Sequence, residues 1–250
     1  MKELFSAVLY TPFLNLLVFL YNTVAFNDFG AAIILLTLII RFVLSPLSVK
    51  TIRSQKALSE LQPKIKEIQG KFKDDSKKQT QEVMELYRKY NVNPFSGCLP
   101  LLIQLPVLIA LYQVSIAGFE ENSLSALYSF VENPNFLNSK SFGFIDLTKR
   151  SILLSLIAGI AQFLQTKLSL SFQKSQAFQR DQKGGPFGAM NQQMLYFFPL
   201  ITIIISMSFP AGLPLYWVAT TVFSIFEQAY INKIYGESKG SNRKFNLPDR

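Results

Sequence analysis

The sequence of 250 residues contains no histidine and one cysteine, Cys98. Without histidine, the chain has no imidazole for general acid–base catalysis and no HExxH zinc site. A single cysteine excludes an intrachain disulfide and a metal cage of thiolates, so we interpret Cys98 as a small apolar side chain. Walker and GxGxxG motifs are also missing, which argues against ATP-driven transport by this chain. We therefore expect no enzyme activity, no cofactor and no metal.

Charged residues are scarce, at 16% of the chain, whereas hydrophobic residues make up 49%. Several apolar runs approach 20 residues, the length that a helix needs to cross the ~30 Å hydrocarbon core of a bilayer. We predict spans at residues 29–49, 95–114, 151–171, 194–208 and 215–231. The predicted fold class is an all-α polytopic membrane protein with a core of five transmembrane helices.

The basic residues are unevenly distributed, and their distribution predicts the topology. Segment 50–92 holds 11 Lys and Arg against 6 Asp and Glu, and segment 172–190 holds 3 against 1. Residues 232–250 hold 5 against 2, whereas segment 115–150 holds 3 against 4. By the positive-inside rule, segment 115–150 and the N-terminus lie outside and the other three lie in the cytoplasm. No groove-reading motif accompanies the positive charge, so we expect a membrane surface or ribosomal RNA as its partner, not DNA.

Segment 50–92 is polar and has the spacing of two packed helices. The first seam, with spacings of 3, 4, 3 and 4, consists of Leu58, Leu61, Ile65, Ile68 and Phe72. The second seam consists of Thr80, Val83, Tyr87 and Tyr90. Ser76 and Gln79 between them are typical of a capping box at a helix start. We predict a cytoplasmic helical hairpin, which serves either as a passive spacer or as a mobile binding element.

The two ends of the chain differ from the core at 29–235. Within residues 1–28, the stretch from Leu4 to Ala25 is apolar but interrupted by Pro12, Asn15 and Asn22. A membrane span and a cleaved N-terminal signal are both consistent with this pattern. We favour an amphipathic helix lying on the outer surface of the membrane. Residues 236–250 are polar and basic, and we predict that this tail is disordered.

Arg41 lies slightly past the middle of the first predicted span. Its guanidinium stays charged at ordinary pH, and at that depth it costs at least ~2.5 kcal/mol. Thr37, Arg41, Ser45 and Ser48 recur at spacings of 4, 4 and 3, so they share one face of the helix. This polar face is directed at protein or water rather than at lipid.

Other spans carry polar stripes of their own, which have two explanations. They could join helices to one another and leave Arg41 as a structural residue bonded to buried carbonyls. They could instead surround Arg41 and form a hydrated groove, which we favour. The candidate groove residues besides Arg41 are Thr37, Gln104, Gln162, Gln165, Trp217, Thr221 and Ser224.

Several motifs resemble the YidC/Oxa/Alb family of membrane-protein insertases. They are NPFSGCLPLLIQLP at 93–106, Leu61-Gln62-Pro63, Thr37 with Arg41, and FPAGLPLYW at 209–217. The resemblance covers about residues 10–235 in order. It implies five helices around a groove that is open to cytoplasm and lipid and closed outside. The chain resembles the short bacterial form, without a large extracytoplasmic domain, found in the bacterial plasma membrane. By position, Arg41 resembles the family's groove arginine, Thr37 a substrate contact and Trp217 an aromatic contact.

The resemblance implies that the chain inserts and folds nascent membrane proteins, alone or with the Sec translocon. Nascent chains and the lipid bilayer are the implied partners. The Sec translocon is a candidate partner, as is the ribosome through the hairpin, the loop at 172–190 and the tail. The alternative is a small anion channel or transporter that uses Arg41 as its binding charge, and a third interpretation is a structural scaffold. A transporter commonly contains an internal repeat, and we find none.

Overall fold

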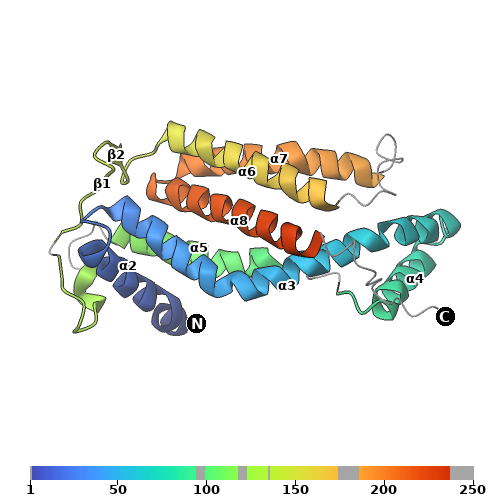
Figure 1. Cartoon of the computed structure of the whole chain (residues 1–250), viewed down its shortest axis with the longest axis horizontal. Helices are drawn as coiled ribbons and strands as arrows, with labels where there is room; N and C mark the ends of the chain where they lie inside the picture. The colour runs from blue at the N-terminus through green and yellow to red at the C-terminus, as the bar shows by residue number, and fades with distance from the viewer. Residues whose placement is uncertain (1, 94–98, 118–122, 135, 174–185, 237–250) are drawn as a thin grey trace. The chain divides into compact units, whose positions relative to one another are not determined.

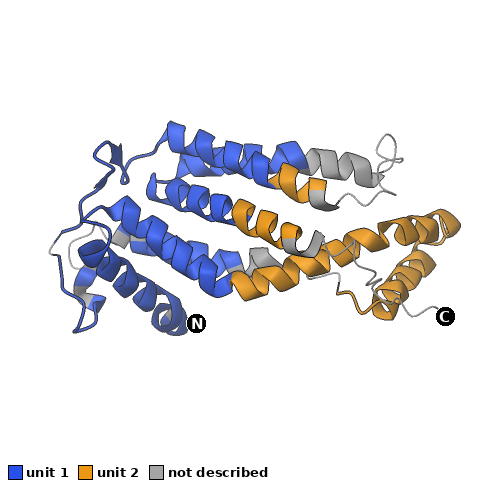
Figure 2. Ribbon diagram, in the orientation of Figure 1, with its two compact units in different colours: residues 1–44, 101–165, 195–224 blue, residues 45–100, 166–194, 225–250 orange. Residues whose placement is uncertain are grey.

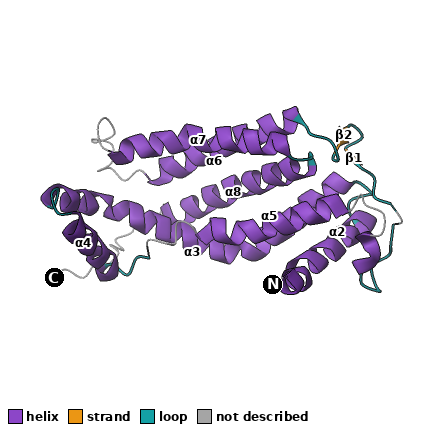
Figure 3. Cartoon of the chain, turned by 180° about the vertical axis from the view of Figure 1, so that it is seen from behind, coloured by secondary structure: helices purple, strands orange, loops and turns teal. Residues whose placement is uncertain are grey.

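The computed structural model of the chain describes residues 2–93, 99–117, 123–134, 136–173 and 186–236. The described residues are mostly helical, which confirms the all-α prediction (Figures 1 and 3). Cys98, residues 174–185 of the predicted loop and residues 237–250 of the predicted tail lie outside the described part. The residues form two compact units (Figure 2). Unit 1 consists of 1–44, 101–165 and 195–224, and unit 2 of 45–100, 166–194 and 225–250.

Five helices correspond to the predicted spans. They are α3 (Phe29–Lys71), α5 (Leu99–Ala117), α6 (Ile152–Gln173), α7 (Pro186–Ser208) and α8 (Gly212–Gly236). Among the described helices, those covering Glu3–Thr23, Phe29–Lys71 and Ile152–Ser171 are long and apolar enough to cross a membrane. Shorter apolar helices cover Gln104–Val114 and Leu195–Ser208. The chain is thus a helical membrane protein, and five crossings remain the prediction.

The N-terminal segment packs into the core of unit 1. It forms α1 (Lys2–Phe5), a π-helical turn at Ser6–Tyr10 and α2 (Thr11–Thr23). Leu14, Leu17 and Val18 of α2 are fully buried in the cluster that contains Phe29 and Leu36 of α3. The segment is therefore joined to the core by a wide apolar contact. Its placement on the outer surface of the membrane stays a prediction.

Residues 123–150 cover one end of unit 1, where α3 and α6 begin (Figure 1). They contain a 3-10 turn at Ser123–Ala126 and two short strands, β1 (Lys140–Ser141) and β2 (Ile145–Asp146), which pair antiparallel. Asn15 is buried beneath this segment, where its Oδ1 accepts the N–H of Tyr128 at 2.5 Å. The backbone N–H of Ala211 donates to Lys149 O at 2.8 Å, which joins the α7–α8 turn to the same segment.

Asp28 connects the start of α3 to this covering segment. Its Oδ1 caps the helix by accepting the N–H of Ala31 at 2.9 Å and also accepts Ser141 Oγ at 2.6 Å. Its Oδ2 accepts the N–H of Phe142 at 2.5 Å. Partial burial raises the pKa of Asp28, but these hydrogen bonds outweigh burial, and the pKa lies below its usual value. Gly30 belongs to the same junction, because a Cβ there would overlap Ser141 Oγ.

Unit 2 contains the predicted hairpin. The second half of α3 continues through Pro46 and Pro63 and lies against α4 (Ser76–Lys89). Gln79 Nε2 donates to Gln69 O at 3.2 Å, and Lys64 Nζ donates to the Tyr90 hydroxyl. The first bond lies close to the turn between the helices, and the second lies far from it. A residue earlier in α3 therefore bonds to a residue later in the chain, so the two helices are antiparallel.

Two details of the hairpin prediction are wrong. Asp75, not Ser76, is the N-cap of α4, since its Oδ1 accepts the N–H of Lys78 at 2.9 Å. Thr80 is exposed and donates to Ser76 O at 2.9 Å, whereas the neighbouring Gln79 reaches α3. In both cases the residue that takes the predicted role is the polar neighbour one position earlier in the sequence.

Candidate functional site

Arg41 forms the centre of a polar cluster within unit 1, which we call the Arg41 cluster: Arg41, Gln104, Tyr216 and Thr220. Arg41 Nε donates to Thr220 Oγ1 at 3.2 Å, and Arg41 Nη2 donates to Gln104 Oε1 at 3.1 Å. Gln104 Nε2 in turn donates to the Tyr216 hydroxyl. Two other helices, α5 and α8, therefore hold the guanidinium that α3 supplies.

The local sequence explains how α8 supplies two of these side chains. Tyr216 and Thr220 are four residues apart, so they lie one above the other on the same face of the helix. Both are buried, and Ser224, a further four residues along, donates its hydroxyl to Thr220 O at 2.9 Å. The partners that these bonds give Arg41 are neutral oxygens. They orient the planar guanidinium.

The other predicted groove residues are placed as follows. Thr37, one turn from Arg41 toward the start of α3, is 1% exposed, and its hydroxyl donates to Ile33 O at 2.6 Å. Thr221 on α8 is also fully buried, whereas Trp217 is half-buried. Gln162 Nε2 donates to Gln165 Oε1 at 3.2 Å on α6, and both side chains are half-buried.

Sequence reasoning found Arg41 and Gln104 but missed Tyr216 and Thr220. The predicted stripe on α8 began at Trp217, whereas the residues that reach the cluster begin at Tyr216. Both series pass through polar residues at helical spacing, and Ser224 belongs to both. The four-residue steps from Tyr216 to Thr220 and Ser224 were therefore a signal that the sequence contained.

The part of α3 between its first residue, Phe29, and Arg41 has one closely packed side. Phe29, Ile33 and Leu36 are fully buried together with Thr37. Their neighbours in the apolar cluster include Leu111 and Leu215 from other helices of unit 1. Arg41 itself is half-buried. The guanidinium thus lies at the edge of a dry core that fills the capped end of unit 1.

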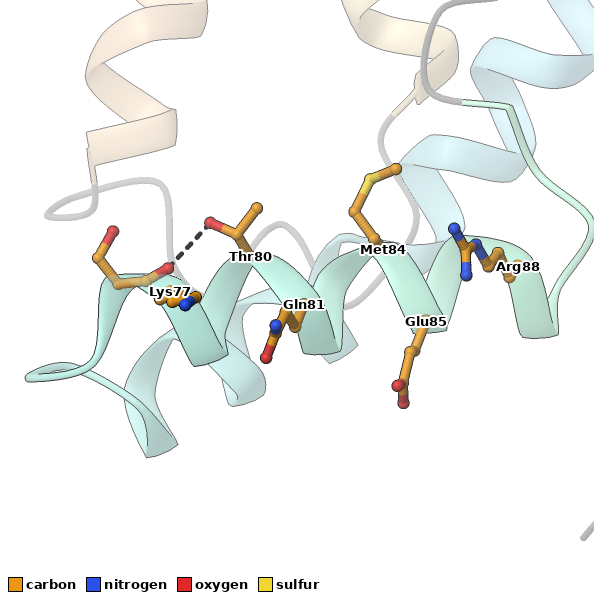
Figure 4. Close-up of a pocket in the computed structure, with 7 residues that line it drawn as sticks. Lys77, Thr80, Gln81, Met84, Glu85 and Arg88 are labelled. Carbon is orange, nitrogen blue, oxygen red and sulfur yellow. Dashed lines mark hydrogen bonds between the residues drawn. The ribbon is translucent and has the colours of Figure 1, made fainter.

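The hairpin of unit 2 carries a second candidate surface, an open hollow of about 800 Å³ along α4. Its lining residues are Ser76, Lys77, Thr80, Gln81, Met84, Glu85 and Arg88. Figure 4 shows Thr80 and Met84 on one side of the helix and Glu85 on the opposite side. Exposed methionine beside charged side chains is typical of adaptable protein-binding surfaces. The side of α4 that carries Thr80 and Met84 is therefore a candidate surface for a protein partner.

Comparisons with known proteins identify relatives over most of the chain. The family model described as "60Kd inner membrane protein" matches residues 19–239. The "Membrane protein insertase YidC" of Oceanobacillus iheyensis is 37% identical over 213 residues, which cover 83% of this chain and 76% of the relative. The protein of the same name from Fusobacterium nucleatum is 32% identical over 227 residues, which cover 90% of this chain and 97% of the relative.

A solved structure is also similar. It is described as "Active YidC insertase crystal structure with the first transmembrane domain resolved", and it matches with a TM-score of 0.57 and 27% sequence identity. The match covers 90% of this chain and 46% of the solved chain. The similarity therefore extends to the arrangement of the helices, while the solved chain is more than twice as long as the part that matches.

Proposed function

Because this chain belongs to the 60Kd inner membrane protein family, which includes the YidC insertases, we propose that it inserts and folds nascent membrane proteins in the bacterial inner membrane. The process is physical and forms no covalent bond. The observation that carries the proposal is the Arg41 cluster, in which a permanent charge within the apolar helix α3 donates to Thr220 and Gln104 of two other helices. The insertase names of the relatives support it.

The proposed role of Arg41 is to attract the segment of a substrate that must cross the membrane. Such a segment is often acidic, and its carboxylate is attracted more strongly beside a half-buried guanidinium than in bulk water. We propose that the partly exposed Gln104, Gln162, Gln165, Trp217 and Ser224 line a hydrated groove around this charge. Thr37 and Thr221 are each 1% exposed and belong to the packed interior beside it. The groove shortens the dry part of the path. The apolar segment of the substrate then leaves sideways into lipid, where burial of its apolar surface provides the driving force.

The packing beside α3 supports an insertase over an anion channel. A channel needs an aqueous route past Arg41 to both sides of the membrane. The fully buried Phe29, Ile33, Leu36 and Thr37 leave no space for water along this side of α3. A charge beside a packed apolar core suits attraction and lateral release better than passage of an anion.

We further propose a topology and a set of partners. The N-terminus and segment 115–150 lie outside, and the hairpin and the C-terminus lie in the cytoplasm, as the positive-inside rule predicts. The surface of α4 around Met84 suits docking of a cytoplasmic partner such as the ribosome, and insertion proceeds alone or beside the Sec translocon. Attraction by Arg41 does not depend on either partner.

Reconstitution tests the proposal directly. The purified chain in vesicles should insert a small single-span protein, measured as protease protection of its translocated end. The matched control is the release of a fluorescent anion from the same vesicles, which should not exceed that of empty vesicles. Selective anion release without insertion would refute the proposal and favour a channel.

A further inference from the structure

Phenylalanine side chains are unusually exposed at the capped end of unit 1. The exposed fractions are 93% for Phe26 and 76% for each of Phe130, Phe136 and Phe144. Phenylalanine is usually buried, and a group of exposed apolar side chains marks a surface that contacts a partner or a membrane. The proposed function does not use these rings, so they require an explanation of their own.

Two of the exposed phenylalanines lie in strained turns. Phe26 and Phe142 have φ angles of 52° and 51°, a left-handed conformation that bulky side chains rarely adopt. Phe142 begins the tip of the β1–β2 hairpin, Phe142-Gly143-Phe144, and Gly143 is also left-handed, with φ 79°. Strain of this kind persists only where the surrounding structure fixes it, and it often accompanies function.

Asp28 holds the hairpin turn against the start of α3. Its carboxylate caps α3 two residues after Phe26, and it accepts both the Phe142 N–H and Ser141 Oγ. The hairpin tip is therefore held on a rigid support, with its rings directed away from the core. A loop that only covered the core would bury these rings instead.

The surroundings of the hairpin indicate what covers the rings. The exposed Lys149 and Arg150 follow the hairpin, and they lead directly into Ile152 and Leu153, exposed apolar side chains at the start of α6. Because α6 is a candidate membrane span, its exposed apolar face is a lipid-facing surface. The aromatic tip and the basic residues directly precede that surface in the sequence. Aromatic rings beside Lys and Arg are the composition of a membrane–water interface, where cations meet lipid phosphates.

We propose that the hairpin tip Phe142–Phe144 inserts into the interfacial layer of the lipid bilayer, with Lys140 and Arg150 beside the lipid phosphates. Lys149 is paired with Asp146 at 3.1 Å and is not needed for this placement. The tip anchors the capped end of unit 1 at a defined depth. The proposal needs neither the insertase function nor a particular side of the membrane.

Spin labelling in vesicles tests this placement. A cysteine replaces Phe144 in a Cys98→Ser background, and the labelled protein is reconstituted into vesicles of phosphatidylethanolamine and phosphatidylglycerol. The control is Glu132→Cys in the same background. Glu132 is exposed and lines an open hollow of about 430 Å³ that also contains Asn22, Asn27, Asn138 and Phe136, and its backbone carbonyl accepts Asn22 Nδ2. The measurement is the accessibility of each label to oxygen, which concentrates in lipid, and to a water-soluble nickel chelate.

The label at 144 should shift toward oxygen and away from the nickel chelate, whereas the label at 132 should stay accessible to the chelate. Equal accessibility at the two positions would overturn the proposal. A label at 144 shielded from both reagents would also overturn it, because protein, such as a second copy of the chain, would then cover the tip. Phe144→Trp provides a second measurement, since lipids brominated near the headgroup should quench the emission that this variant adds to that of the native Trp217. A protein that fails to insert substrates but shows the oxygen shift would refute the proposed function and retain this inference.

Discussion

Arg41 offers the sharpest test, because attraction and bracing predict different results. At 4 Å, two unit charges attract by about 1 kcal/mol in bulk water and by about 4 kcal/mol at the effective dielectric near a protein surface. If Arg41 attracts a carboxylate that is crossing, Arg41→Ala should slow insertion of an acidic substrate by about five-fold to several-hundred-fold. A substrate with Asn in place of the translocated Asp should be affected far less.

Arg41→Lys and Thr220→Val separate charge from geometry. One ammonium cannot reproduce the planar fork that reaches both Thr220 and Gln104, so Arg41→Lys should lose about one charge-assisted hydrogen bond, or ~1.5–3 kcal/mol of stability. Thr220→Val removes the Nε partner and keeps the guanidinium. Both variants should melt at lower temperature yet still insert the Asp substrate faster than Arg41→Ala does.

The assay is insertion of the paired Asp and Asn substrates into vesicles, with a melting curve for each variant. If Arg41→Ala slows both substrates equally and also lowers the melting temperature, Arg41 is a structural brace and the attraction mechanism is wrong. If Arg41→Lys behaves like Arg41→Ala toward the Asp substrate, charge alone is insufficient and the mechanism also fails.

Three further predictions concern the cap and the hairpin. Gly30→Ala should lower the stability of the fold by about 1–3 kcal/mol, because the new Cβ would overlap Ser141 Oγ. Gly70→Ala, where the Cβ would enter open space, should raise stability by ~0.5–1 kcal/mol. Equal melting temperatures of the two variants would contradict the close packing at Gly30. Because its pKa is lowered in the folded state, Asp28 stabilises the fold above its unfolded pKa, and this is lost as pH falls through the folded pKa. Asp28→Asn should therefore show a smaller acid-induced fall in melting temperature than wild type, and identical pH profiles would count against the role. Deletion of 58–87 should leave a purifiable membrane core but reduce insertion; failure to purify it would make the hairpin structural.

The sequence was most informative where periodicity alone determines the result. The spacing of Thr37 and Arg41 placed both on one helix face, and the two seams predicted the antiparallel hairpin. Periodicity cannot determine how far a helix rotates against its neighbours. Tyr216 rather than Trp217 reaches Gln104 because of that rotation, which depends on contacts between residues 112 apart in sequence.

Long-range partners also explain polar residues that the sequence left unexplained. Asn15 interrupts an apolar run, and its partners Ala126 and Tyr128 are more than 100 residues away. Asp28 reads as an ordinary N-cap, yet it also binds the hairpin around Ser141. The segment 115–150 offered no recognisable chemistry. Its role as a cap becomes visible only when the strands and their partners are placed.

The capped end and the Arg41 cluster together constrain how the proposed insertase could work. Phe29, Ile33 and Leu36 are fully buried on the side of α3 between the cap and Arg41. A substrate segment attracted by the guanidinium therefore meets packed apolar side chains on the side of Arg41 toward the cap. A charged segment is not trapped there, since its desolvation in that core would cost more than the attraction returns. An apolar segment has the opposite preference, because lipid is adjacent and burial of apolar surface is favourable. Under the proposed function, the charge therefore brings a segment to the edge of the core, and the hydrophobic effect decides that it leaves sideways.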